Sequence, residues 1–499
     1  MNLSRIMSRP PSPDSKVGPV INEKKRAGSA QFESFRSLVL LLLLIPFSGC
    51  DSKSGRPVSQ LERVKQSGEL RVATRYGPST YYEGTNGEAG LEHDLARLFA
   101  ERLKVKVRFL VQDSQPRAER MVAEGKADIS AGGIIQNPER EGRPRFAPAY
   151  RSVTEQVLYG GDRPPPPDIA ALGRGVLEIA AGSHHVATLK QLRRRHPSLR
   201  WRVSFGKNVN DLLNFTNDGL IDYTVADSDQ ALIMRRYYPN LRVAFDIGKP
   251  RQLAWALPKS EDASLYDEVA RFFEDIRRNK TLDQLIDRYY GHAEAFDAAL
   301  DSSLRRDYRQ RLPRFKPLFV RAAERHNLDW RLLAAISYQE SKWKSTAVSA
   351  EGVRGLMMLT GNTARELKVR DRFDAAQSIS GGAFYLSQTL AAIPPHIPDP
   401  DRTWYALAAY NLGPGHLWDA RDLVRSKGGD PDKWIEIKRV LPLLGKPSWY
   451  RNTKYGRARG GVAVHYVNSI RRYYDLLVWL TGEEESRKVA LGYGRADGA

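Results

Sequence analysis

The sequence predicts an α/β domain followed by a mainly α-helical domain. Two observations carry this prediction: short strand patterns alternate with helical patterns between residues 70 and 225, and strand patterns fade after Gly291 while helical periodicity continues. The chain has 499 residues, of which 41% are hydrophobic and 27% charged. This length and composition indicate a globular protein with two or three domains, and they exclude a small peptide-like scaffold.

The first 49 residues have the layout of a secretory signal. A polar and basic stretch precedes an apolar run at residues 38–47, which is too short for the roughly 20 residues that span a bilayer. Ser48 and Gly49 lead into Cys50, the only cysteine of the chain, and this arrangement resembles a bacterial lipobox. We expect residues 1–49 to be a signal peptide with a long basic region, Cys50 to be lipidated, and residues 50–56 to form a lipid-anchored linker. A buried free thiol is the alternative for a lone cysteine.

Net charge and export together narrow the possible partners. The chain has 78 Lys and Arg against 58 Asp and Glu, a net charge of +20, which favours an anionic partner. Export excludes nucleic acid, and residues 296–499 hold 33 basic and 22 acidic side chains. An anionic envelope polymer is therefore expected at the C-terminal domain. The lipid would hold the chain at the periplasmic face of the outer membrane, although Asp51 resembles an inner-membrane retention signal and leaves that membrane open.

The first domain shows the pattern of a parallel α/β sheet. Residues 91–103 have apolar positions at helical spacing, and residues 105–111 alternate as a strand. The other predicted elements are strands at 70–74, 127–131 and 220–225, a helix at 118–124, and a strand followed by a helix within 176–192. Ligands of such sheets bind at the carboxyl ends of the strands, so a binding site is expected there.

This order of elements, with its short motifs, resembles the family 3 solute-binding proteins of bacterial amino-acid transporters. The matching residues are Arg71, Ala73, Gly90, Glu92, Asp94, Leu95, Gly125, Ala127, Asp128, Ile129, Gly132, Gly133, Pro138, Glu139, Arg140, Phe146, Pro148, Tyr150, Asp222 and Asp227. The resemblance implies a bilobal domain like that of periplasmic binding proteins over residues 57–292.

The same resemblance implies a site for an amino acid or a peptidoglycan-derived peptide. Arg140 would hold the carboxylate of the ligand, and Asp227 would hold its ammonium group. This fits their chemistry, because a guanidinium binds a carboxylate through two parallel hydrogen bonds and a carboxylate offers only acceptors to an amine. Both residues could instead be ordinary surface charges. His184 and His185 are adjacent and expected to point apart, so neither a metal site nor a cofactor is predicted.

In the helical domain, one carboxyl group lies at the end of an apolar helix face. Asp329 is an N-cap candidate for a helix that starts at Trp330. Leu333, Ile336 and Ser337 form the inward face, and Glu340 continues it. Burial at this position would raise the pKa of Glu340 and suit it to act as a general acid. The alternative is a glutamate at a fraying helix end that turns to water.

Four groups of residues decide between these two interpretations. They are Glu340 with Ser341, then Gly355 to Met358, then Ala409 to Asn411 ahead of Gly413, and finally Tyr466 with Val467. In this order and spacing they resemble the family 1 lytic transglycosylases, whose fold is like that of goose-type lysozyme. The resemblance implies a catalytic domain over residues 293–480, followed by a polar, disordered tail at 481–499.

The resemblance also implies roles for individual residues. Glu340 would be the catalytic acid/base, and Ser341 would lie beside the leaving oxygen. Tyr410, Asn411 and Tyr466 would contact the sugar chain. Met358, a further substrate-binding position, stands where the family usually has Gln, so a hydrogen bond to substrate is expected to be absent there.

The expected substrate is therefore peptidoglycan. With one carboxyl group in a recognised motif, Glu340 would protonate the β-1,4 oxygen between N-acetylmuramic acid and N-acetylglucosamine. It would then take the proton of the C6 hydroxyl as that oxygen closes on C1, leaving a 1,6-anhydromuramoyl end. A ligand of the first domain is expected to regulate this reaction. A lysozyme-like hydrolase and a non-catalytic sensor of peptidoglycan or amino acids are the alternatives.

Overall fold

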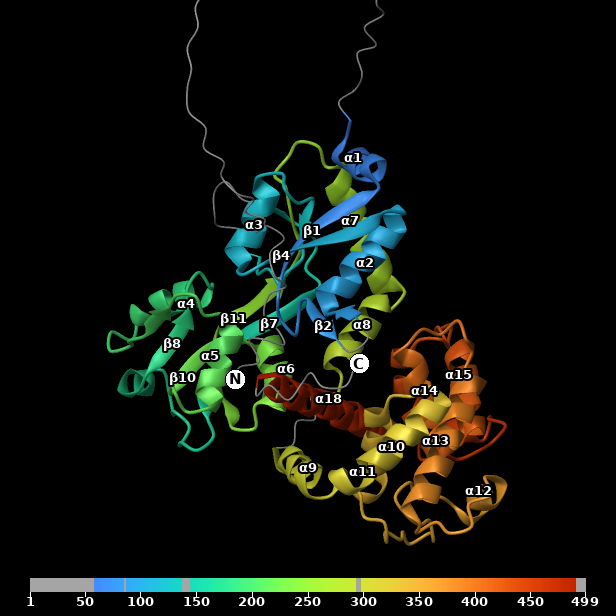
Figure 1. The fold of residues 1–499 in the computed structure, drawn as a ribbon. Helices are drawn as coiled ribbons and strands as arrows, with labels where there is room; N and C mark the ends of the chain where they lie inside the picture. Colours follow the sequence, from blue (N-terminus) through green and yellow to red (C-terminus); the bar gives the residue numbers. More distant parts are fainter. Residues whose placement is uncertain (1–57, 85–86, 137–143, 293–297, 491–499) are drawn as a thin grey trace, which may run out of the picture.

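The computed structural model describes residues 58–84, 87–136, 144–292 and 298–490. Cys50 and Arg140 lie outside the described residues. Figure 1 shows two α/β lobes followed in sequence by a helical domain. The predicted fold class, a bilobal α/β domain and a mainly helical domain, is confirmed. Within the described ranges, no helix combines the length and apolar character needed to cross a bilayer.

The first lobe is built on a five-stranded sheet with the order β4-β1-β5-β12-β6. β1 pairs in parallel with both β4 and β5, and β12 pairs antiparallel with β5 and β6. The strands are β1 (Glu69–Arg75), β4 (Lys106–Gln112), β5 (Ile129–Ser130), β6 (Arg145–Phe146) and β12 (Ala256–Leu257), with a separate hairpin of β2 (Tyr82–Gly84) and β3 (Gly87–Ala89). Its helices are α1 (Gln60–Ser67), α2 (Leu91–Leu103), α3 (Gln115–Ala123), α7 (Ser264–Arg278) and α8 (Thr281–Tyr290). Phe99, Trp255, Phe272 and Phe273 form an aromatic cluster in its core.

The second lobe has the strand order β11-β7-β10-β8-β9. Its strands are β7 (Arg151–Gly160), β8 (Leu177–Ala180), β9 (Arg202–Ser204), β10 (Tyr223–Asp227) and β11 (Leu241–Leu253), and its helices are η2 (Ala170–Arg174), α4 (His185–Arg193), α5 (Val209–Asn217) and α6 (Ser228–Tyr237). β8, β9 and β10 are parallel, but β7 pairs antiparallel with both β10 and β11. The prediction of a parallel sheet is therefore wrong for β7 and β11, the two longest strands, which were not recognised from the sequence.

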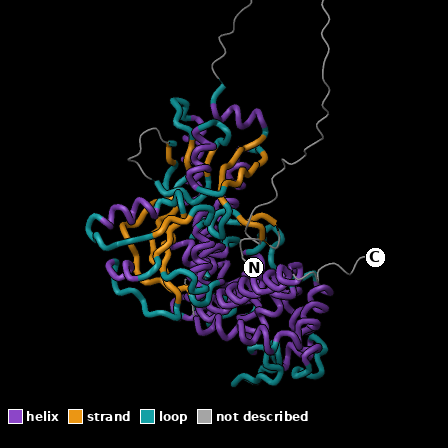
Figure 2. The backbone as a smooth tube through the Cα atoms, turned by 60° about the vertical axis from the view of Figure 1, so that its left-hand side comes forward, coloured by secondary structure: helices purple, strands orange, loops and turns teal. Residues whose placement is uncertain are grey.

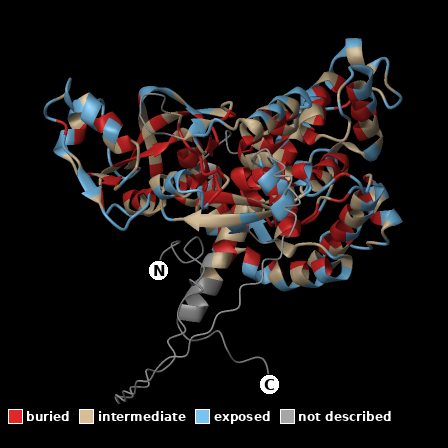
Figure 3. Cartoon of the chain, turned by 90° about the horizontal axis from the view of Figure 1, so that it is seen from above, coloured by how far each residue is buried: buried red, intermediate tan, exposed pale blue. Residues whose placement is uncertain are grey.

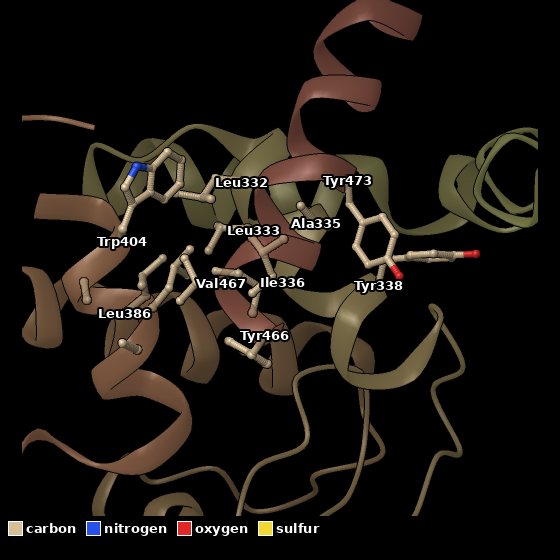
Figure 4. Close-up of a cluster of buried hydrophobic side chains, with 14 of the residues drawn as sticks. Leu332, Leu333, Ala335, Ile336, Tyr338, Leu386, Trp404, Tyr466, Val467 and Tyr473 are labelled. Atoms are coloured by element: carbon tan, nitrogen blue, oxygen red, sulfur yellow. The ribbon is translucent and has the colours of Figure 1, made fainter. Parts of the chain in front are cut away.

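The remaining part of the chain is helical (Figures 1 and 2). Its helices are α9 (Ala298–Gln310), α10 (Leu312–His326), α11 (Trp330–Ser341), α12 (Gly361–Glu366), α13 (Ala375–Ala392), α14 (Asp401–Leu412), α15 (Pro414–Ser426), α16 (Trp434–Val440), η3 (Leu441–Gly445), α17 (Pro447–Tyr450) and α18 (Gly460–Ala490). In Figure 4, Leu333 and Ile336 of α11 lie against Val467 of α18, and all three are fully buried. The contact between α11 and α18 therefore forms the centre of this core.

The C-terminal tail differs from the prediction. α18 continues to Ala490, nine residues beyond the start of the tail that was expected to be disordered after Thr481. The segment is polar, but Glu, Arg and Lys are good helix formers. The prediction of a disordered segment is therefore wrong for residues 482–490.

The two domains meet through charged side chains on α8, α16 and α18. Asp287 of α8 accepts hydrogen bonds from Lys438 of α16 at 2.6 Å and from Arg471 of α18 at 3.0 Å. Arg236 of α6, in the second lobe, donates to Asp475 of α18 at 2.6 Å. Figure 3 shows buried residues throughout the interior of both domains. The long helix α18 therefore contacts both lobes of the first domain and the core of the helical domain at once.

Candidate functional site

α11 positions Glu340 at the edge of the helical core. Asp329 caps the helix, because its carboxylate accepts a hydrogen bond from the backbone of Arg331 at 2.8 Å. Leu333 and Ile336 are fully buried on the inward face, and Glu340, one turn further on, is partly exposed. The helix therefore brings this carboxyl group from the apolar interior to a position that substrate can reach.

The surroundings of Glu340 change its acidity. Burial raises the pKa of Glu340 to about 7, and a hydrogen bond from Tyr466 opposes this rise. Tyr466 lies on α18, is itself buried, and donates its hydroxyl to Oε1 of Glu340 at 2.6 Å. Among the described residues, no second carboxylate contributes to the pKa of Glu340. The site therefore holds one carboxyl group that is partly protonated near neutral pH.

The hydroxyl of Ser341 makes contacts inside the helical domain. Its hydroxyl is buried and lies 3.0 Å from the carbonyl oxygen of Ser337 and 2.9 Å from that of Leu356. The hydroxyl of Ser337, one turn earlier, donates to the same Leu356 carbonyl at 3.0 Å. The two serines therefore hold the 355–358 segment against α11.

The 355–358 segment is a tight turn. Gly355 has a φ of +83°, and a Cβ atom there would lie 1.8 Å from the carbonyl oxygen of Arg372, so only glycine fits. Met358 has a φ of +47° and is half-buried. Its thioether offers a weak hydrogen-bond acceptor and no donor.

Tyr410 and Asn411 lie at the C-terminal end of α14. Tyr410 is partly buried, and both burial and the charge of Glu340 raise the pKa of Tyr410 well above its usual value. Its hydroxyl lies 3.5 Å from the carbonyl oxygen of Met357, while Asn411 is exposed. Gly413, with a φ of +89°, ends the helix. The structure thus brings Glu340, Tyr410 and Tyr466 together from three helices.

One aromatic residue of the site was not predicted. The ring of Tyr385 on α13 packs against that of Tyr410, with the two centroids 5.1 Å apart. Tyr385 lies in a helix rich in small and apolar residues, where a tyrosine has no local feature that distinguishes a site residue from a core residue. Only the packing of α13 against α14 shows its position.

In the first domain, Asp227 lies at the carboxyl end of β10. It is buried and accepts a hydrogen bond from Nε2 of His184 at 3.0 Å. Burial alone would raise the pKa of Asp227, but the charge and hydrogen bond of His184 hold it well below its usual value. The rings of His184 and His185 have their centroids 4.0 Å apart. The expectation that these adjacent side chains point apart is therefore wrong, because the turn before α4 directs both rings towards β7 and β10.

Comparison with known proteins agrees with both halves of this architecture. Residues 317–433 match the model of the transglycosylase SLT domain, and residues 70–292 match that of the bacterial extracellular solute-binding proteins, family 3. The chain is 45% identical over 442 residues to membrane-bound lytic murein transglycosylase F 1 of Alkalilimnicola ehrlichii, covering 88% of this chain and 89% of the relative. It is 40% identical over 457 residues to membrane-bound lytic murein transglycosylase F of Pseudomonas fluorescens, covering 91% and 93%.

The chain belongs to the membrane-bound lytic murein transglycosylase F family. Among solved structures, the solute receptor for L-cysteine of Neisseria gonorrhoeae is 22% identical and covers 46% of this chain and 92% of its own, with a TM-score of 0.42. Within this transglycosylase F chain, the SLT match holds Glu340, Met358 and Tyr410, while Tyr466 lies beyond its end. The residue that donates to Glu340 is thus contributed by a helix outside the matched segment.

Proposed function

We propose that this chain cleaves peptidoglycan with Glu340 as its only acid/base. The class of activity follows from the family: the chain is a peptidoglycan lytic transglycosylase, and therefore a lyase. The observation that supports a single-residue mechanism is the isolated carboxyl group of Glu340, with its pKa raised to about 7 and one tyrosine partner. Glycosidases that use two carboxylates need a second one about 5–10 Å away.

The proposed reaction takes no proton from water, because the proton that leaves with the N-acetylglucosamine oxygen is replaced by that of the C6 hydroxyl. Glu340 gives its proton to the β-1,4 oxygen between N-acetylmuramic acid and N-acetylglucosamine as the bond from that oxygen to C1 breaks. The carboxylate then takes the proton from the C6 hydroxyl while the C6 oxygen bonds to C1. The product is a 1,6-anhydromuramoyl end, and Glu340 regains its starting state without a water molecule.

Burial and Tyr466 each support one half of this cycle. The hydrogen bond from Tyr466 stabilises the carboxylate that exists between the two proton transfers, and burial stabilises the protonated acid before them. A pKa near 7 suits a group that must act first as an acid and then as a base at neutral pH. Tyr410 and Asn411, with Met358 at the turn, are proposed to contact the sugars, and Ser341 to fix that turn.

Digestion of isolated sacculi tests this mechanism. Mass spectrometry of the released muropeptides should show anhydro ends, which are lighter by one water than the products of a lysozyme-like hydrolase. Glu340→Gln should release none of these products, whereas Glu351→Gln, an exposed acid nearby in sequence, should behave like the natural chain. Hydrated ends would support the hydrolase, and equally low activity with and without Glu340 would support the non-catalytic sensor.

For the first domain, we propose an amino acid or a peptidoglycan-derived peptide as ligand. Asp227, at the carboxyl edge of its sheet, would hold the ammonium group, and Arg140 the carboxylate. Ligand-dependent movement of the two lobes would alter the catalytic domain through the contacts of α18, and so regulate cleavage. Calorimetry with amino acids and stem peptides tests the ligand, with Asp227→Asn as the variant that should lose binding. No heat from either class would leave the domain a scaffold role.

For location, we propose a lipid on Cys50 that anchors the chain to the periplasmic face of the outer membrane. The names of the relatives support association with the envelope, and the residues before Cys50 support processing there. The proposed limits are a signal peptide at 1–49, a linker at 50–56, the binding domain at 57–292, the catalytic domain at 293–480 and a tail at 481–499. Labelling with a radioactive fatty acid, followed by separation of the two membranes, tests the anchor against Cys50→Ser. Label in the inner membrane would favour retention through Asp51.

A further inference from the structure

A cluster of histidines and carboxylates lies at one edge of the second lobe, far in sequence from the catalytic glutamate. Glu155 of β7 and Asp227 of β10 are directly opposite each other in the antiparallel ladder, so their side chains are on the same face of the sheet. β8 pairs in parallel with β10, and its carboxyl end leads through Gly182 to His184 and His185. The strand order thus brings these four side chains to the same edge.

The ligand atoms of this cluster are close together. Nδ1 of His185 lies 2.8 Å from Oε1 of Glu155, and Nε2 of His184 lies 3.6 Å from the same oxygen. One ligand atom from each of the three residues lies within 4.8 Å of the other two. In a tetrahedral zinc site with bonds of about 2.0–2.2 Å, ligand atoms are separated by about 3.3 Å. Small rotations of the side chains would therefore bring all three onto one ion.

Neighbouring groups already orient the possible ligands. Oε2 of Glu155 accepts a hydrogen bond from Oγ1 of Thr188 at 2.7 Å and lies 3.4 Å from Nε of Arg251. This leaves Oε1 facing the two imidazole rings. Oδ1 of Asp227 lies 3.0 Å from Nε2 of His184, which is the nitrogen that would bind the ion, so Asp227 must give up this contact when the ion binds. A hydroxyl that orients a carboxylate ligand, as Thr188 orients Glu155, is typical of metal sites.

The cluster is buried except at His184, whose side chain is partly exposed. The side chains of Glu155 and His185 are 1% and 2% exposed, and that of His184 is 18% exposed. Nothing in the cleavage of peptidoglycan uses these residues. We propose that Glu155, His184 and His185 bind one divalent transition-metal ion of the zinc type, which enters on the side of His184.

The chemistry of the donors selects this class of ion. Two imidazoles and one carboxylate oxygen are the ligand set of many zinc sites with an open fourth position, whereas calcium and magnesium prefer oxygen ligands alone. A fourth ligand would be water, Asp227 after it releases His184, or a donor atom of a molecule in the cleft. This inference does not depend on the proposed murein cleavage or on the proposed amino-acid ligand.

Metal titration of the untagged mature chain tests the inference. After removal of metals with EDTA, calorimetry with zinc chloride should give one ion bound per chain, and cobalt(II) should give the visible absorption of a tetrahedral site. His184→Ala should weaken zinc binding by more than about 10-fold. This position is partly exposed, so the variant should keep its circular dichroism spectrum. Glu155→Gln should weaken binding as well.

His396→Ala is the matched control. His396 forms an exposed histidine–carboxylate pair, with Nε2 lying 2.9 Å from Asp432. Loss of this pair should leave zinc binding unchanged. Two results would overturn the inference: no zinc or cobalt signal with the natural chain, or equal affinity in the natural chain and His184→Ala. Either would mean that the cluster is a set of internal ion pairs only.

Discussion

At the scale of single residues, the balance between burial and one hydrogen bond sets the acidity of Glu340. A general acid must be protonated to act, so activity should fall as the pH rises through about 7. Tyr466→Phe removes the hydrogen bond that stabilises the carboxylate, so it should raise the pKa of Glu340 and move this limb of the profile to higher pH.

The rate of muropeptide release between pH 5 and 9 gives both profiles. Tyr474→Phe is a suitable control, because Tyr474 also lies on α18 and donates to a carboxylate, Asp329, at 2.8 Å, away from Glu340. Its profile should follow that of the natural chain. If the fall in activity of Tyr466→Phe occurs at the same pH as in the natural chain, or at a lower pH, a group other than Glu340 controls the titration.

The same burial makes the ionised form of Glu340, the proposed catalytic acid, unfavourable for stability. The pKa of Glu340 is higher in the folded chain than its ordinary value of 4.5, so the folded state binds more protons and loses stability as the pH rises from 4.5 through 7. Gln cannot ionise. Glu340→Gln should therefore be inactive yet more stable than the natural chain at pH 8, by up to about 3 kcal/mol, with the difference vanishing near pH 4.

Denaturant unfolding at pH 4 and pH 8 measures this difference. The sign at pH 8 is the decisive quantity, since a Glu340→Gln variant that is less stable there would mean that the ionised carboxylate is well solvated. In that case the raised pKa would not be a consequence of burial, and the argument for a tuned acid would lose its basis.

At the scale of elements, local signals were enough for some segments and not for others. The helix from Trp330 could be predicted because its cap, Asp329, and its apolar face are adjacent in sequence. β7 and β11 were missed, since their pairing depends on strands far apart in the chain. The same limit applies to the site: motifs indicated Glu340 and Tyr466, but their contact joins residues 126 positions apart.

Orientation was the least predictable property of the site residues. Ser341 follows the catalytic glutamate directly, yet its hydroxyl faces inward because the Leu356 carbonyl lies there. His184 and His185 were expected to point apart, and a turn at the sheet edge brings their rings together instead. In both cases the partners of the side chain come from other segments, Leu356 for Ser341 and Glu155 and Asp227 for the two histidines, so the sequence around the residue does not reveal them.

The tight turn that carries Met358 gives a prediction at this scale. Gly355→Ala would place a Cβ atom 1.8 Å from the Arg372 carbonyl oxygen in a left-handed backbone conformation, so the turn must move. We expect a loss of stability above about 3 kcal/mol and loss of cleavage. Gly361→Ala, at the first position of α12 with no atom within 4 Å, should be neutral or slightly stabilising. Thermal unfolding compares the two, and equal melting temperatures would contradict the described turn.

At the scale of the whole molecule, the described structure joins the two domains mainly through α8. Asp287 is buried and has two cationic partners from the catalytic domain, Lys438 and Arg471. Burial alone would raise the pKa of Asp287, but these two cations hold it below its usual value. Asp283, one turn earlier on the same helix, has an exposed pair with Arg439 at 3.1 Å. The two positions differ in burial, and both join α8 to α16, while Asp287 also reaches Arg471 of α18.

Replacing each aspartate in turn separates a buried contact from an exposed one. Asp287→Ala should cost about 3–5 kcal/mol, because it leaves the fully buried charge of Arg471 without its carboxylate partner, and it should split thermal unfolding into one transition for each domain. Asp283→Ala should cost less than about 1 kcal/mol and keep the natural transition, since exposed pairs contribute little. Differential scanning calorimetry distinguishes these results. A similar small effect of both substitutions would mean that the apolar contacts of α18, such as Trp479 against Tyr237, hold the domains together without the charged network.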